Sequence, residues 1–296
     1  MKSPIFTGSG VAIVTPFKSG GVDFDAFGRI IDWQIDSGID AVIVCGTTGE
    51  SVTMTNEERL RTIAYCVERV AGRVPVIAGS GTNDTAHAVA LSKDAQRAGA
   101  DALLLVTPYY NKATQNGLVQ HYLRILDAVE RPCILYNVPS RTGVSIAPET
   151  CAKLSGHPNM HGIKEASGNL GAVQDILRLC PEDFYVWSGN DDQTVPIYAL
   201  GGKGVVSVVA NVYPTEMRRM TELCKANDFA AAGKLQVQLK KLCDAMFCEV
   251  NPGPVKAAMN LLGLDAGEYR LPMCEPSPEH MAYIRDTLKE YGLLKG

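Results

Sequence analysis

The chain has 296 residues, of which 46% are hydrophobic and 20% charged, and its formal net charge is −4 at pH 7. This composition is typical of a globular protein with one large domain, or one domain and an appendage. The net charge gives no reason to expect nucleic acid or an anionic membrane as a partner, and no apolar run approaches the roughly 20 residues that span a bilayer. The first residues, Met1-Lys2-Ser3-Pro4, lack the apolar stretch of a signal peptide.

Short apolar runs of strand length recur along the chain, and most are rich in Val, Ile or Leu. Because the runs are continuous and do not alternate with polar residues, they are typical of parallel strands covered on both faces. The predicted strands are Val11–Val14, Ala41–Cys45, Val74–Ala78, Ala102–Val106, Cys133–Tyr136, His161–Lys164, Tyr185–Trp187 and Gly204–Val209.

Longer stretches with helical spacing lie between these runs. They include Asp25–Ser37, Asn56–Val70, Asp84–Ala98 and Gln115–Val129. Two junctions nearly repeat, and in each a glycine, Gly38 or Gly99, fits the end of a helix directly before the next strand. The chain is therefore predicted to alternate strand and helix.

Eight such units favour an α/β fold of the (β/α)8 type, a TIM barrel, over an open doubly wound sheet. A Rossmann fold is disfavoured because no strand leads into Gly-x-Gly-x-x-Gly. After about Pro214 the strand signals stop, and the predicted helices are Thr215–Ala226, Phe229–Phe247, Pro254–Leu262 and Pro278–Tyr291. We predict a barrel over residues 1–225 and a C-terminal helical region over residues 226–296.

The nine cysteines include no Cys-x-x-Cys pair, and none has zinc-ligand spacing with one of the five histidines. Most lie inside apolar runs, as Cys45, Cys66 and Cys133 do. This pattern indicates small buried side chains in a reducing cytoplasm. We predict no metal site, and a catalytic cysteine has little support.

Two predicted strands end in side chains that can do chemistry, Tyr136 and Lys164. Active residues of such barrels lie at the C-terminal ends of the strands. Burial disfavours a charged ammonium, a neutral amine attacks ketones, and a nearby tyrosine can move the protons. Each residue alone has a plain alternative. Lys164 can reach solvent or pair with Glu165, and Tyr136 can simply fill the core.

Further polar residues follow neighbouring strands. The Gly46-Thr47-Thr48-Gly49-Glu50 turn follows the second strand, and the N–H groups of such a turn can bind an anion such as a carboxylate. The alternative interpretation of this segment is an ordinary turn between a strand and a helix that has Thr55 as its N-cap. Tyr109 and Tyr110 follow the fourth strand, and Arg141 lies beyond the fifth, where a solvated arginine is the ordinary case. We expect these residues to converge on one barrel mouth.

Together these segments resemble the class I pyruvate aldolases, and most of all the dihydrodipicolinate synthase family, from Gly10 to about Leu271. The segments that carry the resemblance are Gly46–Glu50, Ile134–Gly143 and Gly162–Asn169. The resemblance implies a lyase that condenses pyruvate with L-aspartate-4-semialdehyde to 4-hydroxy-tetrahydrodipicolinate, the first committed step of diaminopimelate and lysine biosynthesis. No cofactor is implied, because the imine itself is the electron sink.

The resemblance also implies residue roles. Lys164 would form the Schiff base with pyruvate, and Tyr136 would shuttle protons in a relay with Thr47 and Tyr110. Tyr110 would reach into a neighbouring subunit of a homo-oligomer, commonly a tetramer built as a dimer of dimers. The positions that match the family's substrate site are Thr48, Arg141, Gly189, Val206 and Asn251.

Arg141 discriminates between substrates. A carboxylate-bearing aldehyde needs a planar bidentate clamp, which arginine supplies and lysine does not. The resemblance implies that N-acetylneuraminate and 2-keto-3-deoxy-sugar-acid aldolases, the alternative within the enzyme class, differ at this position. A barrel without catalysis is the alternative from another class, and the complete residue set argues against it. Lys256 is expected to have a structural or surface role.

Members of the family that lysine inhibits are implied to bind it at a dimer interface, through an acidic residue and a histidine. The matching positions are Ser51, Val52, Asn56, Arg59, Asn83, His87 and Tyr109. His87 occupies the acidic position and cannot pair with the ε-ammonium of a lysine ligand. We therefore expect weak or absent inhibition by lysine, unless Glu50 approaches the site.

Overall fold

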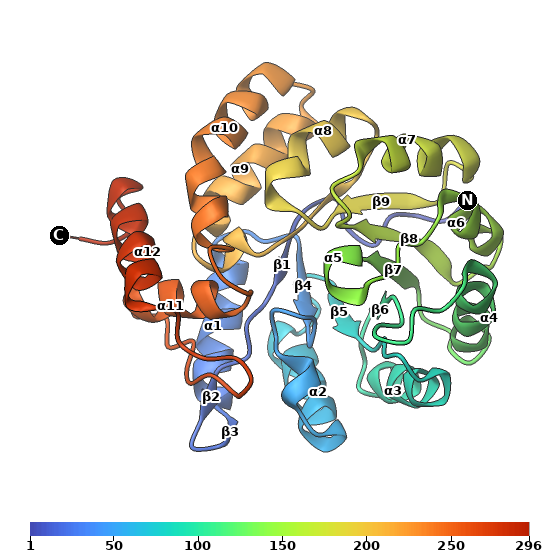
Figure 1. Cartoon of the computed structure of the whole chain (residues 1–296), viewed down its shortest axis with the longest axis horizontal. Helices are drawn as coiled ribbons and strands as arrows, with labels where there is room; N and C mark the ends of the chain where they lie inside the picture. Colours follow the sequence, from blue (N-terminus) through green and yellow to red (C-terminus); the bar gives the residue numbers. More distant parts are fainter. Residues whose placement is uncertain (296) are drawn as a thin grey trace.

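The computed structural model describes residues 1–295. Within them, eight parallel strands close into a barrel, and the last strand pairs with the first. Figure 1 shows the barrel strands surrounded by helices. The strands are β1 (Gly8–Ala12), β4 (Ala41–Val44), β5 (Val76–Gly79), β6 (Ala102–Val106), β7 (Cys133–Asn137), β8 (Met160–Glu165), β9 (Tyr185–Ser188) and β10 (Gly204–Ser207). The predicted TIM barrel is confirmed.

A helix follows each barrel strand, and every one of them except the last returns the chain to the start of the next strand. These helices are α1 (Phe24–Asp36), α2 (Asn56–Val70), α3 (Thr85–Arg97), α4 (Gln115–Leu126), α6 (Pro148–Ser155), α7 (Leu170–Leu179), α8 (Thr194–Ala199) and α9 (Pro214–Lys225). A short helix, α5 (Pro139–Thr142), lies in the loop after β7, and a hairpin of β2 (Phe17–Lys18) and β3 (Gly21–Val22) follows β1. The hairpin was not predicted.

Helix α2 shows how local sequence sets an element. The hydroxyl of Thr55 accepts a hydrogen bond from the backbone N–H of Glu58, while the Glu58 carboxylate accepts one from the N–H of Thr55. This reciprocal capping box satisfies two N–H groups that the first turn leaves free. The helix begins at Asn56 and ends at Val70, as predicted, and Thr55 is its N-cap.

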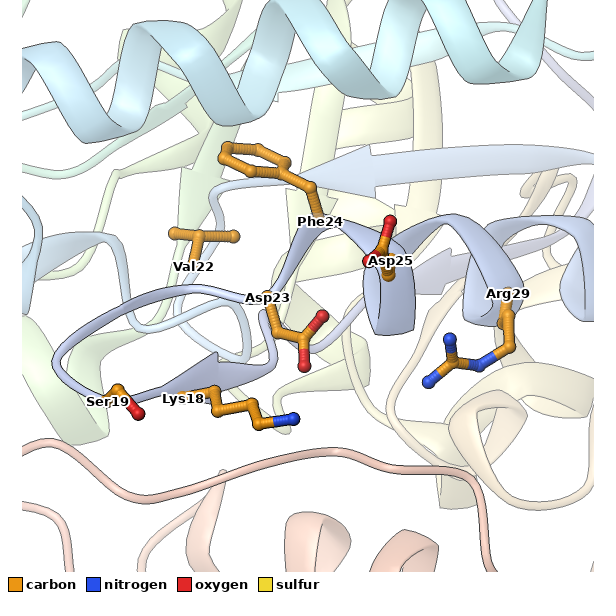
Figure 2. A pocket seen from close by; sticks show the side chains of 7 residues that line it. All are labelled: Lys18, Ser19, Val22, Asp23, Phe24, Asp25 and Arg29. Carbon is orange, nitrogen blue, oxygen red and sulfur yellow. The ribbon is translucent and has the colours of Figure 1, made fainter.

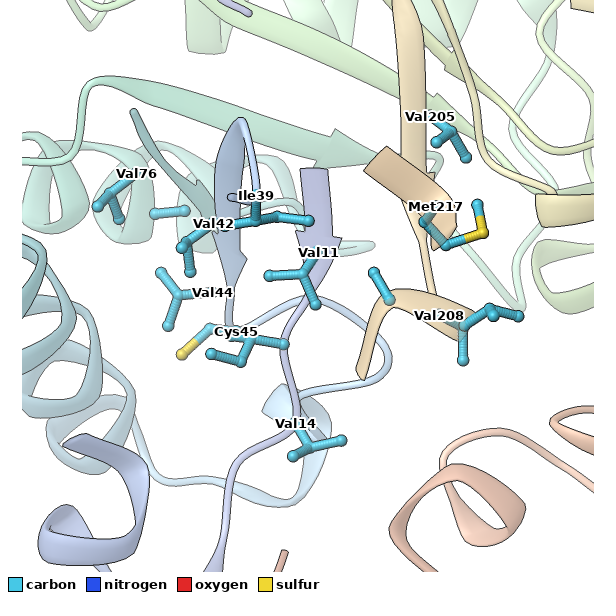
Figure 3. Close-up of a cluster of buried hydrophobic side chains, with 14 of the residues drawn as sticks. Val11, Val14, Ile39, Val42, Val44, Cys45, Val76, Val205, Val208 and Met217 are labelled. Atoms are coloured by element: carbon cyan, nitrogen blue, oxygen red, sulfur yellow. The ribbon is translucent and has the colours of Figure 1, made fainter. Parts of the chain in front are cut away.

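The hydrophobic core has two layers, one inside the barrel and one between the strands and the surrounding helices. The strands separate them because successive side chains of a strand point to opposite faces. On β4, Ala41 and Ile43 join the cluster that fills the barrel, while Val42 and Val44 pack outward against the helices. Figure 3 shows part of the outer layer, in which Val42 and Val44 lie near other buried aliphatic side chains. This parity decides which strand residues can reach the barrel interior.

Three further helices complete the described chain: α10 (Phe229–Ala245), α11 (Gly253–Leu261) and α12 (Pro278–Glu290). Helix α10 contacts α8, α9 and α12, and α11 contacts α12. Figure 1 shows these helices beside the barrel. The predicted boundary between residues 225 and 226 falls in the turn between α9 and α10.

The other end of the barrel is closed by the N-terminal segment. The ammonium group of Lys2 donates to the carbonyl oxygens of Ser155, at 3.1 Å, and Met160, at 2.7 Å. Met160 is the first residue of β8, so this contact lies at the N-terminal ends of the strands. Among residues 1–295, no helix is long and apolar enough to cross a membrane.

Candidate active site

Strands β7 and β8 bring Tyr136 and Lys164 side by side. The two residues are partners in the strand register, and each is the last but one of its strand. The ammonium nitrogen of Lys164 lies 4.2 Å from the centroid of the Tyr136 ring. Both side chains are buried, with 5% of Lys164 and 6% of Tyr136 exposed. An amine and a phenol therefore meet inside the barrel, near the C-terminal ends of the strands.

The plain alternatives for Lys164 are wrong. Its side chain does not reach solvent, and the neighbouring Glu165 is engaged elsewhere. The Glu165 carboxylate accepts hydrogen bonds from the Asn137 side-chain amide, at 2.9 Å, and from the backbone N–H of Ser167, at 2.6 Å. Because neighbouring strand residues face opposite ways, Glu165 points away from Lys164.

Gly189 has no side chain, and this absence makes room for the side chain of Lys164. Its N–H donates to the Glu165 carbonyl oxygen at 2.7 Å, which holds the backbone close to β8. A Cβ atom at this position would lie 3.0 Å from Cε of Lys164 and 2.7 Å from Cβ of Ala166. Val206 belongs to the same barrel-filling cluster as Tyr136. Both predicted positions thus adjoin the barrel interior around the lysine.

Asp191 adds a buried acid to this neighbourhood. Its carboxylate accepts hydrogen bonds from the backbone N–H groups of Val208, at 3.0 Å, and Val209, at 3.2 Å. Burial raises the pKa of Asp191, while these hydrogen bonds and the positive charge of Lys164 act in the opposite direction. Asp191 thereby contributes to the electrostatic environment of the lysine. The sequence reasoning did not single it out.

The Gly46–Glu50 turn is held on several sides. The N–H of Glu50 closes the turn on the Thr47 carbonyl oxygen at 3.0 Å. The Thr15 hydroxyl donates to the Gly49 carbonyl oxygen at 2.8 Å, and the Asn251 amide donates to the Thr48 hydroxyl at 3.0 Å. The predicted carboxylate-binding turn is therefore fixed by contacts from distant segments.

Arg141 lies on α5, exposed at the barrel mouth. Its guanidinium donates to the Asn251 carbonyl oxygen at 3.2 Å, so Asn251 joins the loops that carry Thr48 and Arg141. Asn137 fixes the base of the Arg141 loop, because its side-chain oxygen accepts from the Ile146 N–H at 3.0 Å. The predicted substrate-binding residues are thus tied together.

One cavity of about 340 Å³ opens beside these residues. Its lining includes Thr47, Tyr136 and Arg141, and it extends to several of the predicted effector positions. Those positions are Ser51, Val52, Asn56, Arg59, His87 and Tyr109. Asn83 adjoins the cavity through a hydrogen bond to the Tyr109 carbonyl oxygen at 3.3 Å.

Two of the predicted catalytic residues, Lys164 and Tyr110, are not among the residues that line this cavity. Lys164 adjoins it through the ring of Tyr136, which does line it. Tyr110 lies at the surface of the described chain. Its side chain is 90% exposed, and its backbone has a φ of +76°. A tyrosine in this conformation projects from the surface of its own chain.

The effector region carries positive and neutral groups. Arg59 is buried and donates twice to the Gly79 carbonyl oxygen, while His87 contacts the Asn56 amide oxygen at 3.1 Å. No aspartate or glutamate of the described chain lines the cavity. The Glu50 carboxylate lies 2.8 Å from the Lys256 ammonium and does not line the cavity, so the described chain gives no support to the exception made for Glu50.

Lys256 itself differs from expectation. A surface role was one of the two predicted for it, yet its side chain is 0% exposed. It lies on α11, and Glu50 is 206 positions away in the sequence. Since no local pattern links two residues so far apart, the pair could be found only from the fold.

A second hollow lies outside the barrel, along the β2–β3 hairpin and the start of α1, where Figure 2 shows its side chains. It is lined by Lys18, Ser19, Val22, Asp23, Phe24, Asp25 and Arg29. None of the predicted site residues is among them. Within residues 1–295, no three or more His, Cys, Asp or Glu side chains form a metal-binding group.

Comparison with known proteins gives a consistent result. The dihydrodipicolinate synthetase family matches residues 5–291. The 4-hydroxy-tetrahydrodipicolinate synthases of Thermoanaerobacter sp. (strain X514) and Acetivibrio thermocellus are 53% and 50% identical over 293 and 294 residues. The alignments cover 99% of this chain in both cases and 99% and 100% of the relatives. The crystal structure of dihydrodipicolinate synthase from Aquifex aeolicus is 45% identical, with a TM-score of 0.96, and the match covers 98% of this chain and 100% of that one.

Proposed function

The chain belongs to the dihydrodipicolinate synthetase family, and on this premise we propose how its residues condense pyruvate with L-aspartate-4-semialdehyde. The enzyme is a lyase of the 4-hydroxy-tetrahydrodipicolinate synthase type, and its reaction belongs to lysine biosynthesis by way of diaminopimelate. The residue roles rest on one observation above all. The Lys164 ammonium nitrogen lies 4.2 Å from the centre of the Tyr136 ring, next to the strand ends of a closed barrel.

The first half-reaction begins on Lys164. Its neutral amine attacks the ketone carbon of pyruvate, and the resulting carbinolamine loses water to give an imine. The Tyr136 hydroxyl supplies the proton that leaves with the water, and Thr47 passes protons to and from Tyr136. The Thr47–Thr48 turn receives the pyruvate carboxylate through its hydroxyls and backbone N–H groups. The burial of Lys164 beside the Tyr136 ring supports this role.

The second half-reaction forms the carbon–carbon bond. Loss of a methyl proton turns the imine into an enamine, whose carbon attacks the aldehyde carbon, and the aldehyde oxygen becomes a hydroxyl. The amino group of the second substrate then attacks the imine carbon, which closes the ring and releases Lys164. Arg141 clamps the carboxylate of the second substrate, and its position at the mouth supports this role.

The choice of the second substrate is tested by a coupled assay. Pyruvate is offered with L-aspartate-4-semialdehyde and, separately, with sugar aldehydes. We expect turnover with the first and little with the others, because Arg141 provides a carboxylate partner that sugar aldehydes do not need. Faster turnover with a sugar aldehyde would contradict the proposal.

Tyr110 is proposed to complete the proton relay of a neighbouring subunit, in a homo-oligomer arranged as a dimer of dimers. Its 90% exposure on the isolated chain supports a role outside its own barrel. Sedimentation of the wild type and of Tyr110→Phe, together with their turnover, tests the proposal. An active monomer with an unaffected Tyr110→Phe variant would refute it.

Inhibition by lysine is proposed to be weak or absent in this enzyme. A lysine ligand needs a carboxylate for its ε-ammonium, and the described cavity offers Arg59 and His87 instead. Losing one charge-assisted hydrogen bond weakens binding by about one to two decades. Initial rates measured against L-lysine decide the matter, and strong inhibition below about a millimolar would overturn the proposal.

We place the enzyme in the cytoplasm. All nine cysteines are free thiols. A reducing compartment maintains them in that state. Fractionation of source cells, with enzyme activity found in the membrane or external fraction, would contradict this placement.

A further inference from the structure

The ammonium group of Lys256 is enclosed in a polar cage. It donates to the Glu50 carboxylate at 2.8 Å, to the Glu268 carbonyl oxygen at 2.5 Å and to the Thr15 carbonyl oxygen at 3.2 Å. The ring of Phe17 lies 4.8 Å from the nitrogen and adds a cation–π contact. These partners come from the β1 loop, the Gly46–Glu50 turn and the segment after α11. One cation therefore joins three parts of the chain.

Glu50 links Lys256 to the turn that contains Thr47 and Thr48, because it is the last residue of that turn. Its N–H closes the turn on the Thr47 carbonyl oxygen, and its own carbonyl oxygen accepts from the N–H and the hydroxyl of Thr53. The backbone of Glu50 has a φ of +52°, in the left-handed region that disfavours residues other than glycine. Such a conformation persists where the surroundings fix it.

The Glu50 carboxylate has two contacts that hold its side chain, the Lys256 ammonium at 2.8 Å and the backbone N–H of Arg270 at 3.5 Å, and the buried ion pair with Lys256 is the closer one. The Glu50 side chain is 1% exposed and that of Lys256 0%, so water cannot take the place of either partner. Removing one member of a buried ion pair leaves an uncompensated charge, which must move toward water or become neutral. For Glu50, that movement would turn the backbone atoms that close the turn on Thr47.

We infer that Lys256 is a positioning residue, which acts through Glu50 to hold the Thr47–Thr48 turn in the shape that receives the carboxylate of pyruvate. It touches no reacting atom. The inference rests on the role proposed above for this turn, and it predicts a specific defect. Loss of the ammonium should weaken the binding of pyruvate and leave the binding of the aldehyde, which Arg141 clamps, nearly unchanged.

The test uses Lys256→Met, a variant of similar length without charge or donors. Borohydride trapping of the pyruvyl adduct, measured by mass spectrometry over a range of pyruvate concentrations, reports the first half-reaction alone. We expect the half-saturating pyruvate concentration to rise about ten-fold or more. A ten-fold change in affinity corresponds to only a small part of the free energy that is lost when one partner of a buried ion pair is removed. The KM for the aldehyde should change by less than about two-fold.

Lys2→Met is the matched control. Lys2 also donates to two carbonyl oxygens, those of Ser155 and Met160, but at the opposite end of the barrel. This variant should lower the melting temperature and leave the pyruvate dependence as in the wild type. The comparison separates a positioning effect from a general loss of stability.

If Lys256→Met does not fold, the double variant Lys256→Met with Glu50→Met takes its place. Apolar replacement of a buried ion pair is often neutral or stabilising, so this protein should fold. The double variant lacks the ion pair between residues 50 and 256, so its half-saturating pyruvate concentration should still be higher than that of the wild type. A folded variant that binds pyruvate like the wild type, or that loses both substrates equally, would overturn the inference. A wild type that traps no pyruvate would instead refute the proposed function.

Discussion

Replacing Gly189 with alanine should displace Lys164 without removing any reactive group. The added Cβ atom would lie 3.0 Å from Cε of Lys164 and 2.7 Å from Cβ of Ala166. Carbon atoms at rest against one another are about 3.5–4.0 Å apart, so the lysine must move by roughly 0.5–1 Å. The perturbation is thus aimed at the position of the nucleophile.

The size of the effect follows from this displacement. A misplacement of about 1 Å can cost about 10²-fold in rate, so we expect the turnover number to fall about ten- to one-hundred-fold. Overpacking of the barrel should also cost about 1–3 kcal/mol of stability. The adduct with pyruvate should still form on Lys164, but more slowly.

The assay compares the rate of borohydride-trapped adduct formation, the turnover number and the thermal melt of each variant. Gly233→Ala is the matched control, since a Cβ atom at this position of α10 meets nothing within 4 Å. Its activity should be unchanged and its stability higher by about 0.5–1 kcal/mol. A Gly189→Ala enzyme with wild-type adduct formation and turnover would refute the reasoning.

Three further predictions concern single side chains. Tyr136→Phe should keep its fold and lose about 10²- to 10⁴-fold in turnover, and near-normal turnover would mean that the hydroxyl moves no essential proton. Arg141→Ala should raise the KM of the aldehyde about ten- to one-hundred-fold while pyruvate is still trapped, and equal damage to both half-reactions would argue for a purely structural arginine. Burial lowers the pKa of His121 from 6.5 to about 4, and its Nε2 is buried without a partner. The unfolded chain therefore binds a proton that the folded chain excludes, so the melting temperature should fall as the pH drops from about 6.5 to about 4. His121→Leu should flatten that dependence, and an unchanged slope would contradict the assignment.

Much of the barrel could be predicted because most of its strands contain an apolar run that local sequence reveals. Strand β1 was placed less well, since it begins at Gly8 and its first three residues, Gly-Ser-Gly, give no apolar signal. The run at Ala102–Val106 matches β6 residue for residue, and the capping box at Thr55 sets the start of α2. The β2–β3 hairpin escaped prediction, since strands of two residues are too short to show any periodicity.

The residues of the candidate site also fall into those that the sequence could place and those that it could not. Tyr136 and Lys164 could be placed from sequence because strand parity and the barrel rule decide where strand-end residues point. The pairing of Glu50 with Lys256 could not, because two residues 206 positions apart meet only when the barrel has closed and α11 has packed against it. The role proposed for Tyr110 requires a second subunit, and the sequence of one chain does not define how two subunits meet.

The central claim is that Lys164 is the nucleophile, and the most direct measurement is the site of covalent labelling. The protein is incubated with pyruvate and borohydride, digested and analysed by mass spectrometry. We expect one reduced pyruvyl group per subunit, on the peptide that contains Lys164, and none in Lys164→Ala. Labelling of another lysine, or undiminished labelling of Lys164→Ala, would contradict the account.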